Sequence, residues 1–301
     1  MVEENIPDTG SVKAGTRDSK HDSERQPRKR PIPYPDWDGW LEALRGRLNE
    51  QLAVWPEAVD ERLDLVNLEN SEDVPAEGDV LVYVHGYLGE GRLDGIQTSG
   101  ANQAAALREA LSNEFEERSG SPPTVIAGMW NSSTAWPRAM RRAVMAGRTL
   151  ARWVETHVDK YDSLTLVGHS LGGRVALITL RNLVKSKVTS AGLLGAAVSP
   201  SAVRGDYRPG IERGVEERVY NYHSVNDLVV CNLYSFLEGH DGIGCMGALV
   251  PDGSHNSGAS LPEKYVDVDV SETVHQHMDY FKPTSDTEAG NCVTQLVENQ
   301  L

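Results

Sequence analysis

The sequence predicts an α/β fold with a mostly parallel central sheet and helices on both faces. Apolar runs of strand length alternate with amphipathic runs of helix length, which favours parallel strands joined by helical crossovers. One apolar run ends in a glycine cluster with a serine at its centre. The 301 residues, 39% of them hydrophobic, are enough for one large domain. Active sites in such sheets lie at the carboxyl ends of the strands.

The first part of the chain is predicted to be a disordered charged tail, residues 1–30, followed by a single domain over residues 31–301. The tail has seven basic and six acidic side chains and almost no large apolar ones, so it buries too little surface to fold. The domain is expected to open with a helix, because Trp37 and Trp40 follow helical spacing after Asp36, a candidate N-cap.

The rest of the domain alternates between the two element types. Strands are expected where short runs are rich in Val, Leu, Ile and Tyr, and helices where apolar residues recur on one stripe. The expected strands are 79–86, 123–130, 163–168, 189–198, 217–224 and 264–271, and the expected helices are 98–118, 134–158 and 171–184.

Charge and hydropathy narrow the class of partner. The formal net charge of −15 disfavours nucleic acid, which needs a basic surface. Arginine outnumbers lysine by 21 to 8, and this acidic, lysine-poor composition suits either a halophile's cytosol or an ordinary acidic enzyme from a GC-rich genome. No run of about 18 apolar residues predicts a membrane span, and no secretory leader is visible. We therefore expect a cytoplasmic protein.

The three cysteines give no sign of a metal site. Cys231, Cys245 and Cys292 are an odd number and lack metal-ligand spacing. They are expected to be buried or inert free thiols in a reducing compartment, rather than a Cys231–Cys245 pair.

Ser170 lies in the stretch "TLVGHSLGGRVAL", where an apolar strand meets the start of a helix. A strand ending at Gly168 and a helix starting at Leu171 force a strained turn with the serine at its apex. Side chains at Gly168 and Gly172 would collide in such a turn. The pattern is that of a nucleophile elbow, and the competing interpretation is a phosphate-binding or purely structural glycine turn.

An activated serine also needs amides that stabilise an oxyanion. The strand "VLVYV" ends in His85-Gly86, where a loop of this kind belongs, and Gly86 allows close backbone approach. We expect the N–H groups of Tyr87, or Leu88, and of Leu171 to bind the oxyanion. Because His85 precedes the serine in the chain, it is expected to support the loop rather than act as the base.

Asp227 is the best-placed acid, because it follows the strand at 217–224 and a short loop. Asp206 and Asp241 lie in glycine-containing loops that do not directly follow a strand. Asp227 is also a candidate N-cap of the helix that follows it. His223 is expected to be a core or wall residue of the strand.

His275 and His277 are both candidates for the base, since each follows the last strand. His277 is preferred, because Tyr280 lies three residues further on and would pack the histidine in a helical turn. In that geometry the two imidazoles would point in different directions.

At this point the chain resembles the serine α/β-hydrolases. The segments that carry the resemblance, between Val80 and Phe281, are "HGY", "MWNSS", "GHSLGGRVA", "LLGAAV", "RVYNYHSVNDLVV" and "VDVSETVHQHMDY". They are most similar to a poorly characterised group that includes eukaryotic transmembrane and coiled-coil-domain proteins. Its D-V-S…H-x-x-Y pattern maps onto His277 and Tyr280. The resemblance implies hydrolase activity but no substrate, and the membrane setting of those relatives does not carry over.

The expected function is that of a serine hydrolase that cleaves a carboxylic ester with Ser170, Asp227 and His277, without metal or cofactor. Thioesterases, lipases, amidases and acyltransferases use the same three groups, so the sequence leaves these open. It also leaves open a non-catalytic binding module on the same fold, and it does not predict an oligomeric state. The expected partner is a small acyl ester.

Overall fold

The computed structural model of the protein describes residues 63–68, 77–89, 92–93, 96–97, 100–248, 260–281 and 291–301. The chain divides into two units, Met1–Ile32 and Pro33–Leu301, and every described residue belongs to the second. The predicted tail at 1–30 and the helix expected after Asp36 lie outside the described residues.

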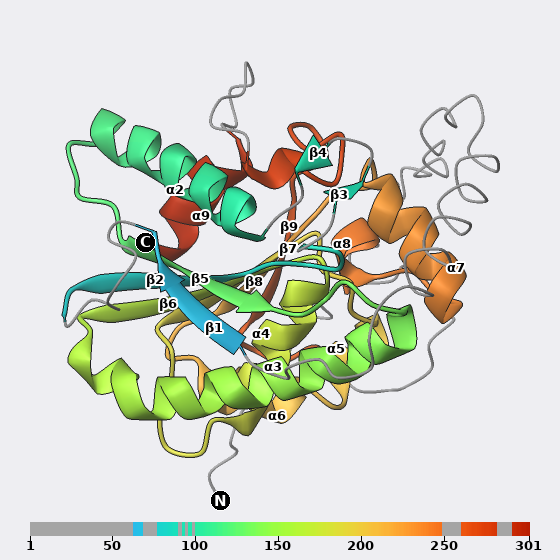
Figure 1. Cartoon of the computed structure of the whole chain (residues 1–301), viewed down its shortest axis with the longest axis horizontal. Helices are drawn as coiled ribbons and strands as arrows, with labels where there is room; N and C mark the ends of the chain where they lie inside the picture. Colours follow the sequence, from blue (N-terminus) through green and yellow to red (C-terminus); the bar gives the residue numbers. More distant parts are fainter. Residues whose placement is uncertain are drawn as a thin grey trace, which may run out of the picture. The chain divides into compact units, whose positions relative to one another are not determined.

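Seven strands form the central sheet in the order β1-β5-β2-β6-β7-β8-β9 (Figure 1). All neighbouring pairs are parallel except β1 with β5. This mostly parallel sheet with crossover helices is the predicted α/β-hydrolase fold. The strands are β1 Leu63–Asn67, β2 Asp79–Val84, β5 Thr124–Trp130, β6 Ser163–His169, β7 Ser190–Leu194, β8 Val219–His223 and β9 Tyr265–Asp269, and a separate ribbon pairs β3 Arg92–Leu93 with β4 Ile96–Gln97.

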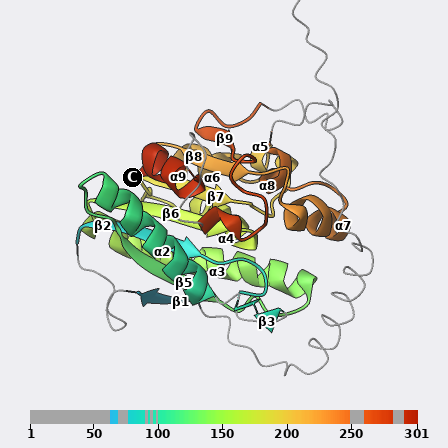
Figure 2. The same cartoon turned by 90° about the horizontal axis from the view of Figure 1, so that it is seen from above.

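Helices cover both faces of the sheet. Helices α3, α4 and α6 pack on one face, and α2 and α9 pack on the other, as Figures 1 and 2 show from two directions. The helices are α2 Gly100–Glu117, α3 Trp136–His157, α4 Leu171–Asn182, α5 Pro200–Arg204, α6 Arg208–Gly214, α7 Ser235–Glu238, α8 Ile243–Met246 and α9 Cys292–Gln300, with short 3-10 turns η1 Val158–Lys160 and η3 Asp279–Phe281 and a π-helical segment η2 Val229–Tyr234.

Strand β2 shows how the sequence builds these two layers. Successive side chains of a strand point to opposite faces. Val80, Val82 and Val84 therefore pack toward α3 and α4, whereas Leu81 and Tyr83 pack toward α2. Both sets are buried, which is why a strand at the centre of a parallel sheet reads as a continuous apolar run.

Several elements differ from the sequence prediction, and three of these differences have a physical reason in the structure. Strand β7 ends at Leu194 rather than at residue 198, because Gly195 adopts a left-handed φ of 52° that breaks the strand. The antiparallel β1 was not predicted, since only one of its five residues is buried and two are exposed. Helix α9 was not predicted either, although Asn291 and Thr294 form a reciprocal capping box at its start.

Candidate active site

Ser170 occupies the turn between β6 and α4 with φ 54° and ψ −122°, a left-handed conformation that a side chain rarely adopts. Its N–H donates to Leu194 O at 2.9 Å. A Cβ on Gly168 would lie 2.4 Å from Gly172 O, and one on Gly172 would lie 2.1 Å from Val84 O. Only glycine fits at either position, so the turn is fixed by steric exclusion.

The loop after β2 lies directly against the serine. A Cβ on Gly86 would be 2.6 Å from the Cβ and 3.1 Å from the Oγ of Ser170. Leu88 adopts a left-handed φ of 59°, which turns the loop sharply. The N–H groups of Tyr87 and Leu171 donate to no acceptor within the described part of the chain. Two amides are therefore available on the elements that flank Ser170.

His85 holds this loop from beneath. Its buried ring donates from Nδ1 to Gly86 O at 2.9 Å and accepts at Nε2 from Trp130 N–H at 3.2 Å. Trp130 Nε1 in turn donates to His85 O at 2.9 Å. Burial lowers the pKa of His85 to about 4, so the ring is neutral at pH 7. Because both ring nitrogens already have backbone partners, this imidazole has no free position for a serine proton.

The segment after β5 also positions the loop, which the sequence reasoning did not assign. Ser132 Oγ accepts from Gly89 N–H at 3.1 Å, and Tyr87 OH donates to Thr134 O at 2.7 Å. The Tyr87 ring packs edge-on against Trp136 with centroids 5.2 Å apart. The "MWNSS" segment and the residue that follows it, Thr134, therefore each hold the loop by one hydrogen bond.

Asp227 is fully buried and accepts four hydrogen bonds. Its Oδ2 accepts from His277 Nδ1 at 2.8 Å and from Tyr280 OH at 3.2 Å. Its Oδ1 accepts from the N–H groups of Val229 and Val230 at 3.1 and 3.2 Å. The carboxylate therefore caps the helical segment η2 and orients the His277 ring at the same time.

The two candidate histidines are placed differently. The His277 side chain is 15% exposed and faces Asp227, whereas His275 is exposed. The carboxylate of Asp279 accepts from the N–H groups of His275 and Gln276 at 3.1 and 2.9 Å, which closes the turn that separates the two rings. No hydrogen bond joins Ser170 Oγ to the His277 ring among the described residues.

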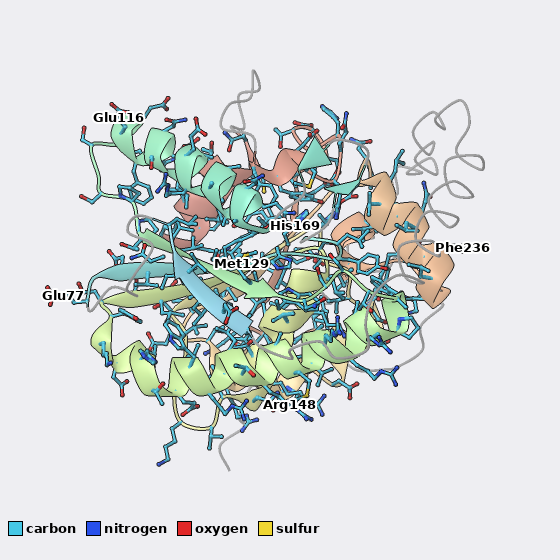
Figure 3. The ribbon with its side chains drawn as sticks, viewed as in Figure 1. Glu77, Glu116, Met129, Arg148, His169 and Phe236 are labelled. Atoms are coloured by element: carbon cyan, nitrogen blue, oxygen red, sulfur yellow. A yellow bond between two sulfur atoms is a disulfide. The ribbon has the colours of Figure 1, made fainter. Side chains whose placement is uncertain are left out.

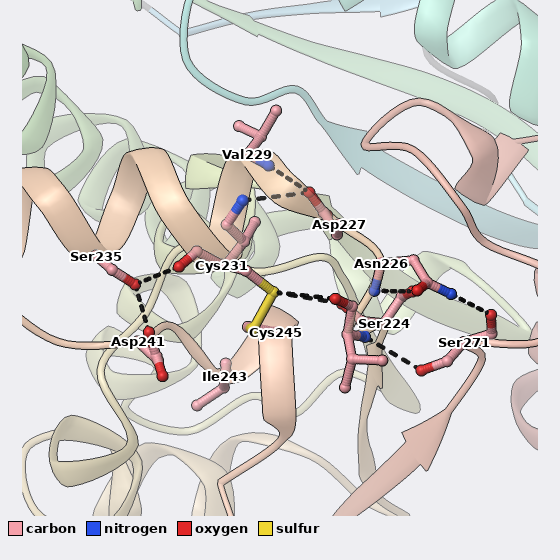
Figure 4. The surroundings of a disulfide bond; sticks show 12 residues. Ser224, Asn226, Asp227, Val229, Cys231, Ser235, Asp241, Ile243, Cys245 and Ser271 are labelled. Carbon is pink, nitrogen blue, oxygen red and sulfur yellow. Dashed lines mark hydrogen bonds between the residues drawn. A yellow bond between two sulfur atoms is a disulfide. The ribbon is translucent and has the colours of Figure 1, made fainter. Parts of the chain in front are cut away.

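Hydrogen bonds join the loop that carries Asp227 to the loop that carries His277. Ser224 Oγ donates to Val274 O at 2.6 Å. Ser271 Oγ accepts from Val225 N–H at 3.1 Å, and Asn226 Nδ2 donates to Ser271 O at 2.7 Å (Figure 4). These contacts join segments more than forty residues apart in the chain. Nothing in the local pattern of either loop predicts them.

The prediction of three free thiols was wrong for two of the cysteines. Cys231, in η2, and Cys245, in α8, form a disulfide, with Cα atoms 5.0 Å apart (Figure 4). They are 14 residues apart in the chain, and tertiary packing of α8 against η2 brings them together. Cys292 is a buried thiol, and burial raises its pKa, so the reactive thiolate is disfavoured.

The remaining candidates lie outside this cluster. Asp206 is exposed between α5 and α6, and exposed Asp241 accepts from Ser235 Oγ at 2.5 Å. His223 is buried within β8. A depression of about 440 Å³ between α2 and Pro122–Pro123 adjoins the amino end of β5, at the opposite edge of the sheet from Ser170.

Part of the chain matches a known protein family. Residues 128–287, just over half of its length, match a family model described as "Protein of unknown function (DUF726)". The chain belongs to this family. The match includes the turn at Ser170 and the loops of Asp227 and His277, whereas the loop after β2 with His85 and Tyr87 lies before it.

A curated relative fits the predicted group. The chain is 28% identical over 164 residues to the rice (Oryza sativa subsp. japonica) "Transmembrane and coiled-coil domain-containing protein STS1", covering 53% of this DUF726 chain and 23% of the rice protein. The match thus spans less than a quarter of that relative. None of the described helices here combines the length and apolar character that crossing a membrane requires.

Solved structures similar to this DUF726 chain include esterases. An esterase of Pyrobaculum calidifontis has a TM-score of 0.40 and 14% identity, covering 86% of this chain and 90% of that one. Est1E from Butyrivibrio proteoclasticus has a TM-score of 0.42 and 13% identity, covering 78% and 92%. Scores this low carry no conclusion about activity, and the fold assignment stands on the sheet order and its crossovers.

Proposed function

We propose that this protein is a serine hydrolase that cleaves carboxylic esters through an acyl-enzyme. The observation that supports this most is the 2.8 Å hydrogen bond from His277 Nδ1 to the buried carboxylate of Asp227, on loops beside the left-handed turn at Ser170. A serine, an acid and an imidazole in this chain order are the parts that nucleophilic acyl transfer needs.

The hydrogen bond to Asp227 fixes the tautomer of His277. Because a carboxylate only accepts, Nδ1 carries the proton and Nε2 keeps its lone pair. In the proposed reaction Nε2 takes the proton of Ser170 Oγ as the oxygen attacks the acyl carbonyl. The Asp227 carboxylate then stabilises the imidazolium, which returns the proton to the leaving alkoxide. The hydrogen bond between a catalytic serine and its histidine is often long in the free enzyme and shortens only when substrate is bound.

The negative oxygen of the tetrahedral intermediate is assigned to the N–H groups of Tyr87 and Leu171. Both lie on elements next to Ser170, and both lack an acceptor within the described residues. A preorganised donor of this type lowers the barrier by about 3 kcal/mol. Water then attacks the acyl-enzyme, with His277 as base for the second time.

The test is a panel of acyl esters and thioesters of increasing chain length, measured on wild type and Ser170→Ala. We expect Ser170→Ala to lower kcat by about 10⁴-fold or more on every substrate that wild type cleaves. Ser133→Ala is the matched control, because Ser133 is also buried but its hydroxyl has no partner in the described structure. Equal turnover by wild type and Ser170→Ala would remove the proposed mechanism.

The proposed cytoplasmic, high-salt setting rests on the sequence. Its support is the net charge of −15 with few lysines. The Cys231–Cys245 disulfide withdraws the support that free thiols would have given to a reducing compartment. A melting series in KCl tests the high-salt part, and full stability without salt would contradict it.

A further inference from the structure

His169 is the residue of β6 next to Ser170, which the proposed mechanism uses as nucleophile. It is the last residue of β6, and the residue is 2% exposed. It lies on the same face of β6 as Val167, which packs in the layer of α2 and α9. Figure 3 labels it near the middle of the molecule.

The turn that carries His277 packs around the ring of His169. His169 Nε2 and His277 O are 2.9 Å apart, and because a carbonyl only accepts, Nε2 carries the proton and donates. The ring centroid lies 4.5 Å from that of His277, 5.8 Å from Tyr280 and 5.0 Å from Phe281. One side chain of β6 thus contacts three of the five residues between His277 and Phe281.

We infer that His169 is a positioning residue, which rests on the proposed function: its hydrogen bond to the His277 carbonyl sets the distance between the base and Ser170. The serine follows His169 by one peptide bond, so its backbone moves with the strand. The base comes from a loop 108 residues later in the chain. This hydrogen bond links the two directly, whereas the hydrogen bond from His277 Nδ1 to Asp227 Oδ2 orients the ring from the loop after β8.

A positioning role suits His169 better than a proton-transfer role. Burial is the main cause that holds the pKa of His169 well below 6.5, and the neighbouring His277 lowers it further, so the ring is neutral and stays neutral when His277 becomes cationic. Its Nδ1 is buried and has no partner among the described residues. The donor of this ring is directed at a backbone carbonyl, where it holds the loop.

The experiment compares three variants by the rate at which a fluorophosphonate labels Ser170, and by kcat and KM on the best ester of the panel. His169→Gln keeps a donor at the reach of Nε2, His169→Asn has an amide too short for it, and His169→Phe keeps the ring without a donor. We expect His169→Phe and His169→Asn to lower the labelling rate and kcat by about 10- to 100-fold, with KM within twofold. His169→Gln should stay within about fivefold of wild type.

Melting temperatures separate this role from a purely structural one. If His169→Phe does not fold, the Gln and Asn pair supplies the comparison, because both replace the ring by an amide. Equal labelling rates for wild type, Gln and Asn would overturn the inference and leave the proposed function intact. Absence of labelling in wild type would instead contradict the proposed function, and the inference with it.

Discussion

The turn at Ser170 and the two loops that carry Asp227 and His277 meet at the same edge of the sheet, but they are held in different ways. Close backbone packing fixes the turn, since a Cβ on Gly168 or Gly172 would collide with a carbonyl oxygen. Hydrogen bonds between distant segments fix the loops, such as Ser224 Oγ to Val274 O. The turn is therefore a local property of one strand and helix, whereas the loops depend on the completed fold.

The first prediction concerns the loops and has the largest expected effect. His277→Ala should lower kcat by about 10⁴-fold, because it removes the ring that Asp227 orients. His275→Ala should lower kcat less than tenfold, because the backbone N–H of His275 donates to Asp279 and its side chain is exposed. Steady-state kinetics on the same ester measures both. The opposite ranking would move the base to His275.

The second prediction breaks the turn instead. Gly172→Ala should destabilise the fold by about 4 kcal/mol or prevent folding, because the new Cβ meets Val84 O at 2.1 Å and His85 O at 2.7 Å. Gly205→Ala is the control, since its nearest atom would be Ser201 O at 3.2 Å. Urea unfolding compares the two variants. If Gly172→Ala were as stable as Gly205→Ala, the steric account of the turn would fail.

The third prediction concerns the disulfide beside the loop that carries Asp227. The double variant Cys231→Ala, Cys245→Ala should lose about 3 kcal/mol of unfolding free energy, as expected for a closed loop of about 15 residues. Wild type treated with a reductant should unfold at the same urea concentration as the untreated double variant. A variant as stable as oxidised wild type, and indifferent to reductant, would show that the bridge contributes nothing.

The fourth prediction uses pH and has the smallest effect. The pKa of His85 is lowered by burial to about 4, so between pH 6.5 and 4 the unfolded chain binds a proton that the folded chain does not. The free energy of unfolding should therefore decrease as the pH is lowered, by about 2 kcal/mol between pH 7 and 5 from His85 alone. His169 acts in the same direction, because burial lowers its pKa too.

Unfolding free energies at pH 7, 6 and 5 measure this dependence. His169→Gln should reduce the slope, since an amide does not titrate and burial lowers the pKa of His169. Stability that is constant or rises on acidification would contradict the assignment of neutral buried rings.

The contrast between the two regions explains what could be predicted from the sequence. Strand β6, the turn and α4 lie in one continuous stretch, where apolar periodicity and glycine spacing carry the information. The same holds for the parallel sheet, whose central strands read as apolar runs. The Cys231–Cys245 disulfide and the carboxylate of Asp279 escaped prediction, because their partners are chosen by packing between loops and not by spacing along the chain.

The part of the site that the sequence missed has the same origin. The motif "GHSLGG" predicts no role for His169, because its hydrogen-bond partner, His277 O, lies 108 residues later in the chain. Tyr280 was predicted to pack near the base, and the structure adds that its hydroxyl donates to Asp227 Oδ2. Local patterns therefore predict which residues form the candidate site, whereas long-range contacts determine their relative positions.

The central claim is that Ser170 is a nucleophile activated by His277. The most direct measurement is peptide mass spectrometry of the protein after treatment with a fluorophosphonate, on wild type and on His277→Ala. The account predicts one phosphonyl group on the peptide that contains Ser170 in wild type, and labelling slower by at least about 100-fold in His277→Ala. A wild type that stays unlabelled, or that is labelled on another serine, would contradict it.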